Sequence, residues 1–394
     1  MTSLSHYFKG TACKYLSAVD ATPKSNQHEI GSNKFTAILG DPGMEKLRFK
    51  ATFLFFDSNN EAPESSKDEV TYYDTRLNQP NRAAEFRLYY RDNPVTEQLR
   101  EGDFCLVAVQ TTGDLLIAVA RRDSDHERRL RYLFDIEDAQ QQWVVGNEID
   151  TGELDLASRS IVEALGIELA DSADDMLDRL VKRFGLQFPP TKEFSSFARE
   201  SLADQVSPRD APDVALEEWM KQEERLFRSL EKAIVEVRLK NGFDAVEPFI
   251  SFSLSVQNRR KSRVGHALEN HLEAIFKAHT VRYERGAKTE GNSKPDFLFP
   301  GSTAYRDPDM TSPPLRMLAA KTTCKDRWRQ ILAEAARIPN KHLFTLETAI
   351  STGQTDEMVA HGVQLVVPPS VLATYTSKQQ AEMLGLGGFL DIVK

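Results

Sequence analysis

The chain has 394 residues, 40% of them hydrophobic, and a formal net charge of −9 at pH 7. This length suggests two domains, and the apolar content is sufficient for a core in each. No apolar run reaches the about 18 residues of a membrane-spanning helix and no signal peptide is evident, so we expect a cytoplasmic protein without a membrane partner. Cys13, Cys105 and Cys324 are widely spaced and form no CxxC motif, which argues against a zinc site or a disulfide framework.

Short strands are predicted in the first half of the chain, after residues 1–20, which we expect to form a short helix or arm. Polar, Gly-containing or Pro-containing turns separate the strands, and this spacing indicates a small all-β barrel. The predicted strands are residues 47–56, 70–75, 85–90, 104–109, 115–120 and 130–134.

Helices are predicted in the middle of the chain. A long amphipathic helix is expected at residues 213–241, with Gly242 as its stop, and another at residues 263–279. Pro189 and Pro190 favour an extended segment at this point of the chain. Shorter helices are expected at residues 161–169, 176–184 and 195–205. The predicted organisation is a first domain at residues 1–165, a linker at 166–190 and a second domain at 191–394.

Positive charge gathers in one tract, although the net charge is negative. Such local tracts contact phosphates even on an acidic protein, whereas a solvated surface is the usual explanation of a bare charge run. The tract comprises Arg259, Arg260, Lys261, Arg263, Lys277, Arg282, Arg285, Lys288 and Lys294.

Residues 317–334 combine a strand with a charged helix. The strand pattern ends at Lys321. Burying a lysine in an otherwise apolar strand destabilises the fold unless the lysine is paired. After a turn, apolar residues from Trp328 onward recur at helical spacing and predict a helix with a buried face. Arg327 and Glu334 lie on one side of that helix.

Asp296 lies at the mouth of a second short apolar strand, whose start Pro295 marks. A carboxylate on one strand and Lys321 on the next suggest a metal-assisted phosphodiester nuclease site, in which Mg²⁺ activates water and the lysine offsets charge. A capping aspartate and a snorkelling lysine explain the same residues. Spacing leaves both interpretations open.

Three segments resemble the EcoRII family of type II (type IIE) restriction endonucleases. They are NRRKSRVGHALENHL from Asn258, KPDFLFP from Lys294 and MLAAKTTCKDRWRQIL from Met317, and residues 342–346 and 362–368 continue the match. The resemblance is dense in the C-terminal half and scattered in the first half. It implies an α/β C-terminal domain of the PD-(D/E)xK restriction-endonuclease type, preceded by an all-β DNA-binding pseudobarrel domain.

The resemblance also implies the chemistry. Such a chain is a Mg²⁺-dependent site-specific deoxyribonuclease that cuts a CC…GG site, 5′-CC(A/T)GG or a close relative, and leaves 5′-phosphates. Asp296 and Glu334 are then the metal ligands, and Lys321 activates. Ala319 occupies the position where an acid is usual, and Glu334 supplies the missing group from the following helix. Glu269 is implied as an assisting acid, although a surface pair with Lys261 or Arg285 explains it equally simply.

DNA contacts of the C-terminal domain follow from the same match. Arg or Lys donates to guanine and Asp accepts from cytosine, so Lys325, Asp326 and Arg327 can read adjacent C·G pairs. Asp326 is otherwise a plain helix N-cap. The further implied contacts are Asn258 at the centre of the site, Arg259, Arg260 and Arg263 on phosphates, and Tyr305 in the active site.

The N-terminal domain is implied to bind a second copy of the target as an effector and to gate an otherwise autoinhibited enzyme. Its sequence departs from relatives, with Ala83 and Ala84 where they are more basic, so it reads a different sequence or binds weakly. The implied partners are target and effector duplexes, a second copy of the chain and a cognate cytosine methyltransferase of a restriction–modification system. The matching positions are His28, Asn33, Lys34, Tyr73, Arg76, Arg82, Glu85 and Arg87.

Two other functions remain open from the sequence. One is a sequence-specific DNA-binding protein, with or without sensitivity to methylation, whose nuclease site is vestigial; the presence of Asp296, Lys321 and Glu334 speaks against it. The other is a nuclease directed at modified DNA by its N-terminal domain.

Overall fold

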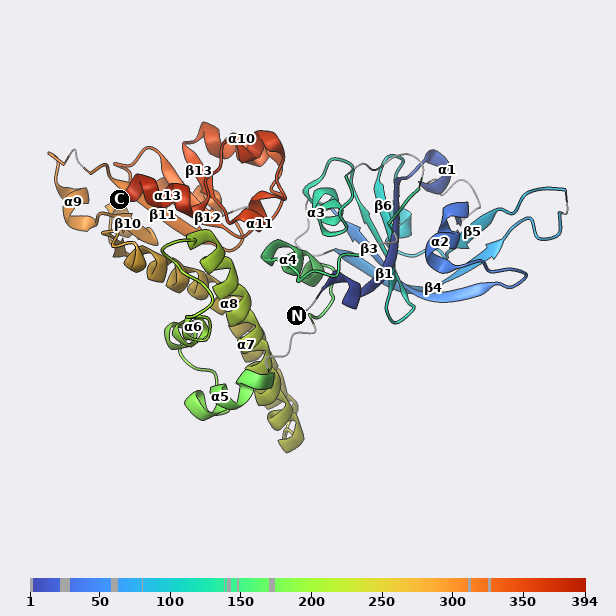
Figure 1. The fold of residues 1–394 in the computed structure, drawn as a ribbon, viewed down its shortest axis with the longest axis horizontal. Helices are drawn as coiled ribbons and strands as arrows, with labels where there is room; N and C mark the ends of the chain where they lie inside the picture. Colours follow the sequence, from blue (N-terminus) through green and yellow to red (C-terminus); the bar gives the residue numbers. More distant parts are fainter. Residues whose placement is uncertain are drawn as a thin grey trace. The chain divides into compact units, whose positions relative to one another are not determined.

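The computed structural model describes residues 3–21, 29–57, 63–79, 81–137, 139, 143–146, 149–169, 174–310, 313–324 and 327–394. The chain forms two compact units, Met1–Leu169 and Ala170–Lys394, and each is described by itself (Figure 1). In the described ranges, no helix has both the length and the apolar character needed to cross a membrane.

The N-terminal unit is built on one eight-stranded sheet of order β2-β5-β4-β3-β7-β6-β1-β8. Neighbouring strands are antiparallel except β3 and β7, which are parallel. The strands are β1 (Phe8–Tyr15), β2 (Glu29–Gly31), β3 (Leu47–Phe56), β4 (Glu64–Asp74), β5 (Phe86–Tyr89), β6 (Phe104–Gln110), β7 (Leu115–Ala120) and β8 (Val144–Gly146).

Both faces of this sheet carry a hydrophobic core, because successive side chains of its apolar strands point to opposite sides. Phe53 and Phe55 belong to one core, and Leu54 and Phe56 to the other. The second core also takes in apolar residues of two helices, α3 (Asp125–Leu133) and α4 (Leu156–Ala164). The short helices of this unit are η1 (Leu4–His6), α1 (Ala18–Ala21), η2 (Asn33–Phe35), α2 (Thr36–Leu39) and η3 (Thr96–Gln98).

The sheet curls so that its two end strands approach each other. Trp143, directly before β8, donates a hydrogen bond from Nε1 to the carbonyl oxygen of Gly31 in β2, at 3.2 Å. The Trp143 ring also packs on Phe35, with ring centroids 4.7 Å apart. Side-chain packing therefore closes the gap that strand pairing leaves open.

The structure corrects two expectations for this unit. Residues 8–15 are not a helix or arm, because β1 pairs with both β6 and β8 inside the sheet. Residues 130–134 are not a strand; they end α3, which Ser124 caps by accepting a hydrogen bond from the Glu127 amide. The other five predicted strands are confirmed as β3 to β7.

The C-terminal unit contains a five-stranded sheet of order β13-β12-β11-β10-β9. β11, β12 and β13 run parallel, and β9 and β10 extend the sheet with antiparallel pairing. The start of β10 therefore lies beside the end of β11 at one edge of the sheet. The strands are β9 (Glu284–Arg285), β10 (Phe297–Phe299), β11 (Arg316–Lys321), β12 (Lys341–Thr345) and β13 (Val363–Val366).

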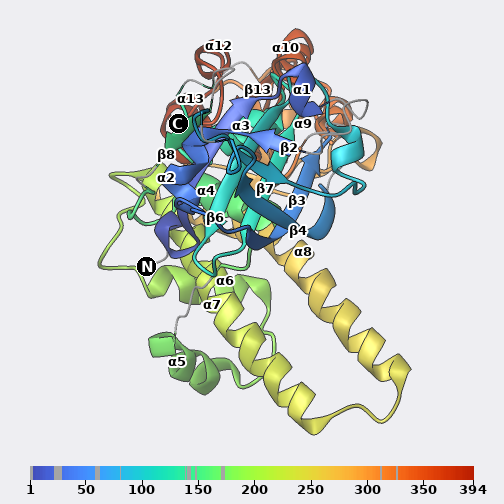
Figure 2. The same cartoon turned by 90° about the vertical axis from the view of Figure 1, so that its right-hand side faces the viewer.

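Two long helices, α7 (Pro212–Asn241) and α8 (Val246–Ala278), form a hairpin whose tip extends beyond the rest of the unit (Figure 2). The C-terminal end of α8 packs on the sheet through Phe276, whose ring lies 5.1 Å from that of Phe297. Two helices in the N-terminal part of the unit, α5 (Asp174–Phe184) and α6 (Thr191–Glu200), share a core with α7. The remaining helices are η4 (Glu290–Asn292), α9 (Ser302–Arg306), η5 (Trp328–Ala333), α10 (Thr352–Ala360), α11 (Pro369–Leu372), α12 (Ser377–Gln380) and α13 (Leu386–Val393).

The helix predictions have mixed outcomes. The long helix ending at Gly242 is confirmed, and Gly242 adopts a φ of +73° after its last turn. The helix predicted at residues 263–279 is real but begins at Val246, so the basic residues 259–263 lie in its middle. The helix predicted after Arg327 is wrong, because only the short 3₁₀ helix η5 forms and Glu334 follows it in extended conformation.

Candidate active site

Asp296 and Lys321 meet at the edge of the C-terminal sheet. Asp296 directly precedes β10, and Lys321 is the last residue of the neighbouring β11. Oδ2 of Asp296 accepts hydrogen bonds from Nζ of Lys321 at 2.8 Å and from the Ala320 amide at 2.7 Å. Because the two side chains are 18% and 27% exposed, they form a partly buried ion pair, not a separate cap and a snorkelling lysine.

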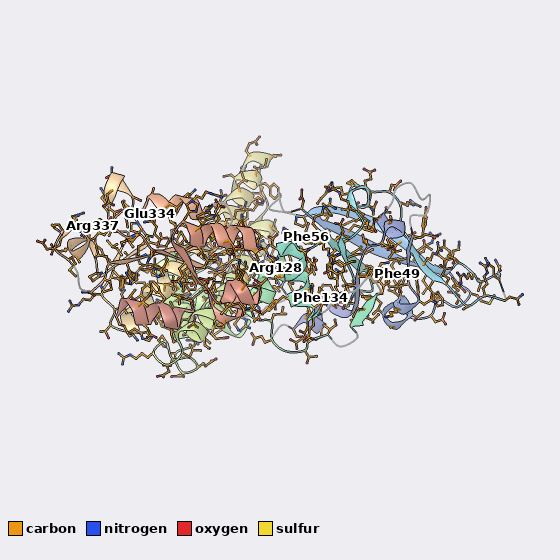
Figure 3. The ribbon with its side chains drawn as sticks, turned by 90° about the horizontal axis from the view of Figure 1, so that it is seen from above. Phe49, Phe56, Arg128, Phe134, Glu334 and Arg337 are labelled. Carbon is orange, nitrogen blue, oxygen red and sulfur yellow. The ribbon has the colours of Figure 1, made fainter. Side chains whose placement is uncertain are left out.

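Glu334 completes a cluster with this pair. Its Oε2 is buried and has no hydrogen-bond partner among the residues that the structure describes. Burial, followed by the negative charge of Asp296, raises the pKa of the Glu334 carboxyl to about 7, although the Lys321 and Lys341 ammonium groups act in the opposite direction. The two carboxylates and Lys321 therefore influence one another electrostatically. Figure 3 labels Glu334 in the C-terminal unit.

The donor set of this cluster fits a Mg²⁺ ion. Mg²⁺ prefers oxygen ligands, keeps several waters and is commonly held by only one or two carboxylates. Among the residues that the structure describes, no group of three or more His, Cys, Asp or Glu side chains is placed to hold a metal. Asp296 and Glu334 supply two carboxylates, and the unpartnered Oε2 of Glu334 is the feature that a cation would satisfy.

Glu269 is paired with an arginine. Oε2 of Glu269, on α8, accepts a hydrogen bond from Nη2 of Arg285 at 2.6 Å. Arg285 lies on β9 and also contacts Glu273, at 3.0 Å. The structure therefore shows the pair with Arg285 that the sequence allowed as one of two interpretations.

Tyr305 is buried, and its hydroxyl group bonds to other groups of the protein. It is 2% exposed, and its hydroxyl donates to Oε1 of Glu290 at 2.6 Å. Burial raises the pKa of Tyr305 to about 12, and the hydrogen bond to Glu290 acts in the same direction. The expected contact of Tyr305 with DNA is therefore not available to the side chain as it stands.

The arginines of α8 have partners within the protein. Arg263 is buried and forms an ion pair with Glu224 of α7, and Arg260 pairs with Glu231, also of α7, with Nη2 and Oε2 2.6 Å apart. Both arginines therefore join the two helices, because acids on α7 face them. Arg259 instead lies over the Phe188 ring, 4.9 Å from its centroid.

Asn258 remains accessible, as a minor-groove contact requires. It is exposed on α8 and lines an open hollow of about 580 Å³ together with Arg259. Arg327 is also exposed, at the start of η5. Lys325 and Asp326, the other members of the predicted base-reading triplet, lie outside the described residues, as does His28.

Five of the predicted residues of the N-terminal unit line one polar cavity of about 520 Å³: Tyr73, Arg76, Arg82, Glu85 and Arg87. Most of them form a continuous network of hydrogen bonds and ion pairs. Glu85 contacts both Arg76, at 2.6 Å, and Arg87, at 2.9 Å.

Glu29 extends this network from β2, since it accepts from Arg87 and, at 2.7 Å, from the Tyr73 hydroxyl. Asn33 holds η2 to the start of β5 through hydrogen bonds to the backbone of Ala84 and Phe86. Lys34 is exposed.

Sequence reasoning missed Glu29, Glu290 and Lys341, which the structure connects to predicted residues. Lys341 opens an apolar strand, the same signal that drew attention to Lys321. Glu290 lies in a polar segment, where nothing distinguishes it from its charged neighbours.

Residues 227–390, which contain the whole cluster, match the family model of the EcoRII C-terminal domain. This part of the chain is EcoRII-like. The type II restriction enzyme EcoRII of Escherichia coli is 45% identical over 206 residues, which cover 52% of this chain and 50% of the relative. The expected resemblance to EcoRII is thus confirmed, and the chain spans about half the length of that relative in the match.

Two solved structures are also similar to the EcoRII-like chain. Metal-depleted Ecl18kI in complex with uncleaved, modified DNA has a TM-score of 0.45 and 18% identity, covering 57% of this chain and 84% of that one. The complex of the restriction endonuclease PspGI with substrate DNA has a TM-score of 0.43 and 16% identity, covering 52% and 92%.

Proposed function

We propose that the EcoRII-like chain is a type II restriction endonuclease that hydrolyses double-stranded DNA at a short CC…GG site. The observation that carries this proposal is the Asp296–Lys321 ion pair beside the unpartnered carboxylate oxygen of Glu334. Two carboxylates with one lysine at a sheet edge form the minimum set for metal-assisted phosphodiester hydrolysis.

Asp296 and Glu334 would hold Mg²⁺. When bound, this ion polarises the scissile phosphate and makes water a better nucleophile at neutral pH. Lys321 donates one of its three N–H groups to Asp296, which leaves two for the attacking water and the phosphate oxygens. Its positive charge offsets the negative charge that develops in the transition state. The 3′ oxygen leaves, and the product carries a 5′-phosphate.

The target follows from the residues that precede η5. By its similarity to EcoRII, we propose 5′-CC(A/T)GG or a close relative as the site. Arg327 is exposed and follows Lys325 and Asp326 in the sequence. Such a triplet offers donors to guanine and an acceptor to cytosine. Asn258, exposed on α8, would contact the centre of the site.

Digestion of plasmid DNA of known sequence tests this function. Purified protein with Mg²⁺ should give discrete ends, each mapping to a CC…GG site, and Lys321→Ala should bind the same DNA without cutting it. Cleavage at unrelated sequences would contradict the proposed target. Binding without cleavage by the unaltered protein would favour a DNA-binding protein with a vestigial nuclease site.

We further propose that the N-terminal unit is a DNA-binding pseudobarrel that takes an effector duplex. The curled sheet, closed by Trp143 against Gly31, and the arginine-containing cavity support this role. An autoinhibited enzyme should cut one-site plasmids poorly and two-site plasmids well, and short duplexes carrying the site should restore cleavage. Equal rates on both plasmids would contradict gating, and preferential binding of methylated duplexes would favour recognition of modified DNA.

A homodimer is proposed because a palindrome-like site presents two related half-sites. The tip of the α7–α8 hairpin exposes apolar side chains that a second copy would cover: Val237, Leu239, Val246, Phe249, Ile250 and Leu254. Phe249→Ser should shift the mass in solution from dimer to monomer, whereas a monomeric unaltered protein would contradict the assignment. A cognate cytosine methyltransferase is the proposed genetic partner, and its methylation should protect plasmids from cleavage.

A further inference from the structure

Glu334 begins a tight turn, residues 334–338, whose backbone forms few hydrogen bonds with the preceding helix η5. Ala335 adopts a φ of +47°, a left-handed backbone conformation that residues other than glycine rarely adopt. Such strain persists only where the surroundings over-determine the backbone. The turn therefore needs external partners, and the structure provides them on both its carbonyl side and its amide side.

Lys341 holds the carbonyl side of the turn. Its Nζ donates to the carbonyl oxygens of Glu334, Ala335 and Ile338, at 2.7, 3.2 and 2.8 Å. Lys341 is 5% exposed, so these bonds are what offset the cost of burying its charge. An ammonium group has three donors, and all three are used on this one turn.

Glu290 and its neighbours hold the amide side. Oε2 of Glu290 accepts from the Ala336 amide at 3.2 Å, and the Tyr305 hydroxyl accepts from the Arg337 amide at 3.1 Å. Tyr305 in turn donates to Glu290, so the two side chains act together. Glu290 is exposed, which places this half of the contact at the surface.

We propose that Lys341 and Glu290 are positioning residues that fix the Glu334 carboxylate opposite Asp296. The proposal rests on the proposed function only in taking Glu334 as a ligand of the catalytic metal. Lys341 bonds the carbonyl of Glu334 itself, and Glu290 fixes the turn two residues later. Neither side chain needs to touch substrate for this role.

A role in packing alone explains these contacts less well. An apolar side chain would fill the position of Lys341 without a buried charge, and Glu290 lies at an exposed position. All three carbonyl groups that Lys341 satisfies belong to the turn that starts at Glu334. The clamp is therefore specific to the segment that carries the carboxylate.

The test uses the full-length protein and four variants. Lys341→Met and Glu290→Ala break the two halves of the clamp, and Glu290→Gln retains an acceptor for the Ala336 amide. Lys378→Met is the matched control, since Lys378 has a 71% exposed side chain that pairs with Asp356. Three quantities are measured: Mn²⁺ affinity by calorimetry, the Mg²⁺ concentration for half-maximal cleavage, and hydrogen exchange of residues 334–340.

Both clamp-breaking variants should weaken Mn²⁺ binding and raise the Mg²⁺ requirement about tenfold, the lower end of the effect of groups that orient metal ligands. Exchange in residues 334–340 should become faster, while binding of target DNA in EDTA stays unchanged. Glu290→Gln and Lys378→Met should behave as the unaltered protein does. Should Lys341→Met fail to fold, the exposed Glu290 variants decide.

Unchanged metal affinity and exchange in the clamp variants would overturn the proposal, even if the protein cuts DNA normally. Weaker DNA binding in EDTA would also overturn it, because it would place these residues in substrate recognition. Should the unaltered protein bind Mn²⁺ but cut no DNA, the proposed function fails, and calorimetry and exchange still decide on the clamp.

Discussion

The ammonium group of Lys321 lies 2.8 Å from Oδ2 of Asp296, joining the end of β11 to the start of β10. This contact places a fixed positive charge beside the carboxylate of the proposed metal ligand. The same aspartate oxygen accepts from the Ala320 amide, so its orientation is determined twice. Charge and orientation at this point underlie the first prediction.

Lys321→Ala should lower the rate of DNA cleavage by at least about a hundredfold, because it removes the donor that offsets charge in the transition state. Affinity for target DNA should change little. Single-turnover cleavage and gel-shift binding measure the two quantities, with the exposed Lys378→Ala as control. Cleavage by Lys321→Ala at the normal rate would remove Lys321 from the mechanism.

Glu334→Gln should stabilise the metal-free protein at alkaline pH. The pKa of this carboxyl is about 7 in the folded protein against an ordinary value of 4.5, so folding favours the protonated form. The cost to stability therefore builds up as pH rises from about 4.5 to about 7, is fully present above 7 and is absent below 4.5. Allowing for solvent screening, we expect Glu334→Gln to increase the free energy of unfolding by about 1–2 kcal/mol at pH 8.5 and to leave it unchanged at pH 4.

Urea unfolding of the C-terminal unit in EDTA measures this difference at both pH values. Glu382→Gln, at an exposed position, is the control for loss of one negative charge. An equal effect of Glu334→Gln at both pH values would show that the gain does not come from ionisation.

Arg263→Met should destabilise the C-terminal unit without changing the salt dependence of DNA binding. Arg263 is buried against Glu224, and breaking a buried ion pair by removing one partner costs about 3 kcal/mol or more. Lys261→Met, at an exposed position of the same tract, should leave stability unchanged. Denaturant unfolding and binding at several salt concentrations test both statements. A shallower salt dependence for Arg263→Met would restore its expected phosphate contact.

Arginines of the N-terminal cavity should divide into two classes. Arg82 is exposed and lines the cavity, so Arg82→Ala should weaken binding of all duplexes alike and reduce the salt slope by about 1. Arg87 is held by Glu29 and Glu85, and Arg87→Ala should cost about 1–3 kcal/mol of discrimination between the best duplex and its single-base variants. Competition binding with a panel of labelled duplexes distinguishes the two. Identical effects of both substitutions would contradict the division.

Patterns within one element were sufficient for much of the fold and for the centre of the site. Short apolar segments separated by turns predicted β3 to β7, and the helical pattern ending at Gly242 predicted α7. The places of Asp296 and Lys321 on neighbouring strands suggested a shared site, although spacing alone also allowed a capping aspartate and a snorkelling lysine.

Contacts between distant elements decided the rest. The apolar spacing after Arg327 is helical, yet the backbone of residues 334–338 bonds to Lys341, Glu290 and Tyr305 instead of to a helix. Arg263 looks like a phosphate contact until Glu224 of another helix is placed against it. Such partners leave no local signal, since neither the spacing nor the composition of one segment records what packs on it.

Both sheets end in short strands. β2 and β8 have three residues each, β9 has two, and β13 has four and is bridged at Val366 by Leu384. A foreign strand can add to a sheet only along a row of unpaired amide and carbonyl groups, and long free edges of that kind promote aggregation. Among the described residues, the outermost strands of both sheets offer such a row over four residues or fewer, whereas β4 is paired on its β5 side only at residues 71–74. The outermost strands are therefore poor templates for joining the sheets of different copies of the protein.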